Sequence, residues 1–177
     1  MFTIPQAAAI GLSQQDISRL VASNDLKRIA RGIYLHPNAK LDRDVGFQVA
    51  FTRFGPEAAI GGLSALFHYN LAEQVPGEVW ILVPPAKRTR ISGYKLLRTK
   101  TSLDKEIVDE KGYRIVSVER AVLEGLKFIT KIGERTAIKA AREALAIRQT
   151  TEIKLAKAAK ELGLESVLAK YLEVITP

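Results

Sequence analysis

Hydrophobic and polar positions follow a helical period in "LSQQDISRLVA". Ile17, Leu20 and Val21 have the i, i+3, i+4 spacing of one buried helix face. Ser13 stands just before this pattern, and Asp16 lies three residues after Ser13, as in a capping box. The segment therefore predicts a short amphipathic helix that begins after Ser13.

A second helix and a hairpin flank this segment. "LKRIARGIYLHP", residues 26–37, predicts two short strands on either side of Gly32, whose access to positive φ suits a tight turn. Upstream, Thr3 and Gln6 form another capping-box pattern in front of an alanine-rich stretch. The first 37 residues thus predict the order helix, turn, helix and hairpin.

The rest of the chain predicts a sheet followed by helices. Three apolar segments have the length and the turn-residue borders of strands: 78–83, 94–100 and 113–118. Helical patterns cover 42–55, 57–71 and most of the chain after Ser117, and "DEKG" at 109–112 predicts a turn.

These elements predict an α+β fold with two parts. A small N-terminal winged-helix-like domain takes residues 1–38, and a mixed α/β domain with a helical C-terminal third takes residues 39–177. The boundary is expected near residues 38–44, where turn residues meet a change of pattern.

Composition narrows the function classes. Of the 177 residues, 47% are hydrophobic and 26% are charged, which is typical of a globular protein. No apolar run approaches the length of a membrane span, and the N-terminus lacks the basic region of a secretory signal. Without cysteine, the chain has no disulfide framework and no thiolate metal site. We expect a cytoplasmic protein with no membrane partner, no metal and no cofactor.

Charge points to a polyanionic partner. The formal net charge is +8, and the excess lies in residues 1–40 and 61–100. Such an imbalance favours nucleic acid among the candidate partners, although many basic proteins bind none.

The amphipathic helix and the basic hairpin together have the chemistry of a DNA-binding winged helix. Glutamine can bond adenine in two places, and serine can bond either partner of a base pair, so the N-terminus of the helix can read base edges. Cations on the hairpin can bind phosphates. The candidate residues are Gln14, Gln15 and Ser18 for bases, and Lys27, Arg28 and Arg31 for phosphates. A solvated helix face beside an ordinary hairpin explains the same pattern.

A second basic segment lies between two predicted strands. Lys87, Arg88 and Arg90 form a candidate second polyanion contact, and a solvated turn accounts for them equally well.

Catalytic and metal motifs are weak. His36 and His68 have no further ligands at close spacing. Ser64 and His68 share one helix face, but no acidic residue is placed to orient the imidazole, so an ordinary structural pair is expected.

Two other motifs favour structural roles. Gly61 and Gly62 lack the lysine of a phosphate-binding loop, so close packing of a helix is the better interpretation. Asp109 and Glu110 superficially resemble a nuclease carboxylate cluster, but they fall in the predicted turn with no second acidic strand beside them.

Four stretches, taken in order, resemble the AbiEi-type antitoxins: "QAAAIGLSQQDISRLVASNDLKRIARGIYLHP", "GGLSALFHYNL", "PGEVWILVPPAKR" and "GYRIVSVERAVLEGLKF". The resemblance implies a winged-helix N-terminal domain joined to a larger C-terminal domain. It implies repression of the protein's own operon through operator repeats. It also implies indirect neutralisation of a nucleotidyltransferase-type toxin, without a stable complex. The implied recognition helix contains Gln14, Gln15, Ser18 and Arg19, and the implied basic wing contains Lys27, Arg28 and Arg31.

The chain departs from this family in two places. Relatives usually have another helix before the one capped by Thr3, so we expect the apolar surface of the two N-terminal helices to need cover from a partner or the second domain. The family's arginine–threonine pair and downstream aspartate are here Arg120, Ala121 and Glu124.

The sequence therefore predicts a DNA-binding antitoxin and autorepressor without catalytic activity, whose oligomeric state is left open. The alternative is a protein-interaction module with a degenerate winged helix and a partner-binding helical tail. A third interpretation is a phosphate-handling enzyme or nuclease that uses Asp109 or Glu110.

Overall fold

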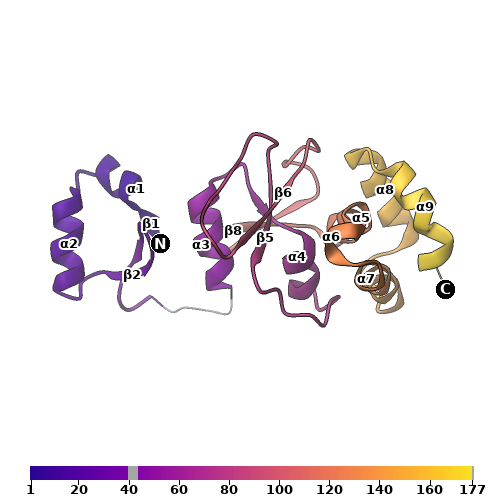
Figure 1. The fold of residues 1–177 in the computed structure, drawn as a ribbon, viewed down its shortest axis with the longest axis horizontal. Coiled ribbons are helices and arrows are strands. Elements are labelled where there is room, and N and C mark those ends of the chain that lie inside the picture. The colour runs from indigo at the N-terminus through magenta and orange to yellow at the C-terminus, as the bar shows by residue number, and fades with distance from the viewer. Residues whose placement is uncertain (40–43, 177) are drawn as a thin grey trace. The chain divides into compact units, whose positions relative to one another are not determined.

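The computed structural model describes residues 1–39 and 44–176, and within them the chain divides into two compact units. The N-terminal unit contains residues 1–55 and 111–113, and the C-terminal unit contains the remainder. Each described unit combines helices with strands of a sheet, so the predicted α+β class is confirmed (Figure 1).

The N-terminal unit has the predicted helices and hairpin plus one further strand. Its elements are β1 (Phe2–Thr3), α1 (Ile4–Ala9), α2 (Gln14–Ala22), β2 (Lys27–Ala30), β3 (Ile33–Leu35) and α3 (Val45–Phe54). Both capping boxes form, with Thr3 and Ser13 as the N-caps of α1 and α2. The helix predicted over 42–55 ends as expected before Gly55, and its first two positions lie outside the described residues.

The three strands form a sheet in the order β1-β3-β2. Successive side chains of β3 point to opposite faces of this sheet, so they pack against different elements. Tyr34 faces α1 and α2, where it joins a small core with Ala7 and Ile17. Ile33 and Leu35 point to the opposite face, and each is only 2% exposed. β3 is therefore covered on both faces.

α3 covers the second face, since it contacts both β1 and β3. Arg53 of α3 donates from Nη2 to the carbonyl oxygen of Arg31 at 3.2 Å, which ties the helix to the hairpin turn. Among residues 1–39, the exposed large apolar side chains are Met1 and Ile10. α1 and α2 thus leave little apolar surface uncovered.

The C-terminal unit is built on a mixed sheet of order β6-β5-β4-β8-β7. Its strands are β4 (Ala59–Ile60), β5 (Val79–Val83), β6 (Tyr94–Arg98), β7 (Ile107–Glu110) and β8 (Tyr113–Val116), the first residue of β8 belonging to the N-terminal unit. β5 runs parallel to β6, β4 runs parallel to β8, and β4 runs antiparallel to β5. The three predicted strands are confirmed as β5, β6 and β8.

Two expectations for this sheet are wrong. The predicted helix at 57–71 is a short strand, β4, followed by α4 (Gly62–His68), because Ala59 and Ile60 pair with β5 and β8. The turn predicted at 109–112 is confined to Lys111 and Gly112, because Asp109 and Glu110 belong to β7, which is hydrogen-bonded to β8.

Helices form the C-terminal third, as predicted. They are α5 (Val118–Lys127), α6 (Ile129–Ile132), α7 (Glu134–Ala146), α8 (Glu152–Leu162) and α9 (Glu165–Ile175). α5 is the central one, since it is buried from Arg120 to Leu126 and contacts α4, α7, α8 and α9 (Figure 1). Within the described residues, no helix has the length and apolarity needed to cross a bilayer.

A buried ion pair fixes a loop to α5. Arg120 and Glu124 are fully buried, and Nη2 of the arginine lies 3.1 Å from Oε1 of the glutamate. The guanidinium also donates to the carbonyl oxygens of Ser102 and Lys105, both at 2.6 Å. Burial raises the pKa of Glu124, and the arginine opposes this rise. Arg120 and Glu124 therefore have a structural role in this chain.

Gly61 and Gly62 pack the start of α4 closely against the sheet, as the sequence predicts. A Cβ on Gly61 would lie 1.7 Å from Cδ1 of Leu82. A Cβ on Gly62, which has a φ of +52°, would lie 2.6 Å from Cδ1 of Leu97. Leu82 and Leu97 are fully buried in β5 and β6, so neither can move away freely.

We therefore expect Gly61→Ala to lower the free energy of unfolding by about 1–3 kcal/mol, the usual cost of overpacking a core. Thermal unfolding should show a melting temperature several degrees lower. Gly77→Ala is the matched control, because a Cβ there meets nothing within 4 Å. Equal melting temperatures for the two variants would show that α4 does not need this close approach.

Candidate nucleic-acid interface

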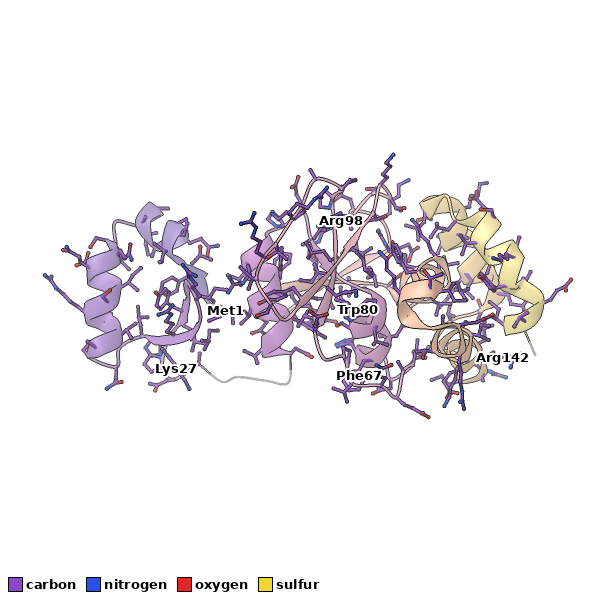
Figure 2. All side chains as sticks on the ribbon, in the orientation of Figure 1. Met1, Lys27, Phe67, Trp80, Arg98 and Arg142 are labelled. Atoms are coloured by element: carbon purple, nitrogen blue, oxygen red, sulfur yellow. The ribbon has the colours of Figure 1, made fainter. Side chains whose placement is uncertain are left out.

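The outer face of α2 gathers four of the predicted contact residues. Gln14, Gln15, Ser18 and Arg19 are all exposed and, with Ser13, line one shallow hollow. The opposite face carries Ile17, which is buried against the N-terminal core. The structure thus points the glutamines outward, and Figure 2 shows the side chains of α2 that project into solvent.

The capping box holds the start of this face rigid. Oδ2 of Asp16 accepts from the backbone nitrogen of Ser13 at 2.9 Å and from its hydroxyl at 2.5 Å. These hydrogen bonds, with a smaller contribution from nearby Arg19, lower the pKa of Asp16. Sequence reasoning assigned Ser13 only the role of a cap, yet it also lines the hollow.

Ser18 and Arg19 differ in how strongly their side chains interact with the rest of the protein. The Ser18 hydroxyl donates to the carbonyl oxygen of Gln14 at 2.9 Å, so its oxygen is left to accept. Arg19 pairs with Asp16 at 3.9 Å, and its side chain is 79% exposed. So exposed an ion pair is weak, which leaves the guanidinium available to a ligand.

The hairpin presents its three cations in different directions. Arg28 pairs with Tyr34 and so lies on the sheet face that carries α1 and α2, whereas Lys27 pairs with Leu35 and lies on the face that carries α3. Arg31 occupies the turn beside Gly32, whose φ of +73° is the positive value predicted. All three side chains are exposed, but alternation brings only Arg28 to the sheet face that carries α2.

Helix and hairpin are joined as one body. The backbone nitrogens of Asp25 and Leu26 both donate to the carbonyl oxygen of Leu20, at 2.8 and 2.9 Å. Leu26 also packs against the core that contains Tyr34 and Ile17. The end of α2 therefore leads directly into β2, as Figure 1 shows for this unit.

The second basic segment lies in the C-terminal unit, and part of it makes hydrogen bonds within its own loop. Arg88 donates from Nη1 to the carbonyl oxygens of Pro85 and Lys87, and Lys87 accepts from Arg98 as well. Arg90 is exposed. Arg88 thus supports the loop conformation, and a polyanion contact by Lys87, Arg88 and Arg90 stays a prediction.

Two of the residues considered for catalysis have structural partners. The buried Ser64 hydroxyl accepts from the backbone nitrogen of Trp80 at 2.9 Å, which supports the structural interpretation of that serine. Asp109 lies 3.4 Å from the guanidinium of Arg114 on the neighbouring strand. In the described part of the chain, no three histidine or acidic side chains are grouped to hold a metal ion.

Comparison with known proteins gives one family. Residues 1–37 match the model of a family described as transcriptional regulator, AbiEi antitoxin. This segment contains α1, α2 and the whole hairpin, so the resemblance predicted from the sequence is confirmed there. No curated protein matches the chain.

The cap of α2 gives a stability prediction. Ser13→Ala should lower the free energy of unfolding by about 1 kcal/mol in urea denaturation near neutral pH, because the backbone nitrogen of Asp16 loses the Ser13 hydroxyl that accepts from it and the Asp16 carboxylate loses the donating hydroxyl. Ser18→Ala is the control on the same helix. It should leave the free energy of unfolding nearly unchanged, because the better helix propensity of alanine offsets the loss of the serine hydrogen bond.

The effect of Ser13→Ala should depend on pH. A lowered pKa means that the Asp16 carboxylate stabilises the fold above the ordinary aspartate pKa, and that this stabilisation is lost as the pH falls through the lowered value. The difference in free energy of unfolding between wild type and Ser13→Ala should therefore become smaller in acid. A gap that stays constant across this range would show that the carboxylate is not the partner that matters.

Proposed function

We propose that this chain is a DNA-binding transcriptional regulator that represses the operon encoding it. The observation that carries the proposal is the joining of an exposed polar helix face and a basic hairpin through one small core. Both lie inside the segment that matches the AbiEi antitoxin regulators. We propose further that α2 is the recognition helix and that the hairpin is the wing.

The dimensions of α2 suit the major groove. Nine residues make a helix about 13 Å long, comparable with the ~12 Å width of that groove in B-DNA. The N-terminal half carries Gln14 and Gln15, and winged and other helix-turn-helix proteins contact bases from that half of the helix. Base contacts from these side chains would supply sequence preference.

The hairpin would supply phosphate contacts. Arg28 shares the sheet face of α2, and Arg31 stands at the turn, where the wing can reach the backbone beside the groove. Lys27 on the other face would reach a different phosphate row. Each cation that neutralises a phosphate releases counterions, so affinity should fall steeply as salt rises.

The wider role follows from the resemblance. We propose that the protein counteracts a nucleotidyltransferase-type toxin through its C-terminal domain, residues 39–177, without a stable complex. We propose no catalytic step and no cofactor for it, and we place it in the cytoplasm with its operator. The family description supports the antitoxin class, and the toxin and its neutralisation are inferred from the resemblance alone.

The test of this function is binding to the promoter of the protein's own operon, measured at several salt concentrations by electrophoretic mobility shift. We expect tighter binding to the promoter than to a scrambled duplex of equal length, by at least 1,000-fold at moderate salt. A protein that binds both duplexes equally at low salt would count against the repressor role, and one that binds neither would favour the interaction module.

Arg31→Ala separates backbone contacts from base contacts. It should weaken binding to promoter and scrambled duplexes by the same factor, and it should reduce the slope of log K against log salt by about 0.9. Lys170→Ala, which removes an exposed cation from α9, is the matched control and should change neither quantity. If both variants behave alike, the phosphate contacts lie away from the turn.

A further inference from the structure

The outer face of α2 is divided into two columns of side chains. Gln14 and Ser18 form one column, and Gln15 and Arg19 form the other, each with the i, i+4 spacing that stacks side chains along a helix. All four line the same shallow hollow. A base edge facing this hollow therefore meets two different sets of hydrogen-bonding groups.

The column of Gln15 and Arg19 retains its full bonding capacity. Among the described residues, no hydrogen bond or ion pair involves the side chain of Gln15. In the same residues, Arg19 has the exposed 3.9 Å pairing with Oδ1 of Asp16, whose other oxygen accepts from Ser13. Glutamine matches the paired donor and acceptor of adenine, and arginine matches the two acceptors of guanine.

In the other column, Ser18 is restricted. Because the Ser18 hydroxyl donates to the Gln14 carbonyl, Ser18 can only accept from a base, which means the amino group of adenine or cytosine. It cannot distinguish those two bases. The column of Gln15 and Arg19 is therefore the one in which each of the two side chains can select a single base.

Building on the proposed function, we infer that α2 reads an adenine through Gln15 and a guanine through Arg19 within one operator half-site. Four residues advance a helix by about 6 Å, and base pairs stack about 3.4 Å apart, so the two bases lie about two base-pair steps from each other. Arg19 is thus a specificity residue rather than a general phosphate contact.

The experiment is a selection of duplexes from a random-sequence pool by the full-length protein, repeated with Gln15→Ala and with Arg19→Ala. The wild type should enrich a motif with an adenine and a guanine one to two steps apart. Gln15→Ala should lose preference at the adenine alone, and Arg19→Ala at the guanine alone, each by on the order of 10-fold. Both side chains are exposed, and unchanged melting temperatures would confirm that the variants fold.

A second measurement distinguishes base reading from phosphate binding. Replacing the selected guanine with 7-deazaguanine removes one acceptor, so it should weaken binding by the wild type and leave Arg19→Ala unaffected. Uniform weakening of all duplexes by Arg19→Ala would overturn the inference, as would an unchanged motif in both variants. A wild type that enriches no motif would instead refute the proposed function itself.

Discussion

The packing of Tyr34 against Ala7 and Ile17 is the contact on which the candidate interface depends. Ile17 lies on the inner face of α2, so burying it turns Gln14 and Gln15 outward on the same short helix. Tyr34 lies on β3, and its pairing fixes the face from which Arg28 projects. Buried apolar side chains therefore set the relation between the groups proposed to read bases and those proposed to bind phosphates.

A core this small needs support, because chains below about 40 residues rarely bury enough apolar surface to fold alone. α3 provides the support by covering Ile33 and Leu35 on the second face of the hairpin. Its Arg53 also donates a hydrogen bond to the carbonyl oxygen of Arg31, the residue at the hairpin turn. The structural unit that presents the interface therefore extends beyond residue 38, whereas the division of functions between residues 1–38 and 39–177 stays a prediction.

Local signals in the sequence were sufficient for α1, α2 and the hairpin, because capping boxes, helical periodicity and Gly32 act over a few residues. They were insufficient for β4 and β7. Ala59 and Ile60 are too few to show a period, and they form a strand only through pairing with β5 and β8. Asp109 and Glu110 have low strand propensity, which tertiary pairing overrides. The engagement of Arg88 by its own loop likewise depends on a conformation that composition does not specify.

The opposite orientations of Lys27 and Arg28 constrain how the hairpin can meet a duplex. A hairpin lying flat on the backbone would use one sheet face and leave one of these cations in solvent. A hairpin that enters a groove by its turn has a phosphate row on each side, so side chains from both faces can reach phosphates. The minor groove is about 6 Å wide and attracts arginine where it narrows, which suits Arg31 at the turn. Under the proposed function, alternation along β2 therefore favours approach by the turn, with α2 in the adjacent major groove.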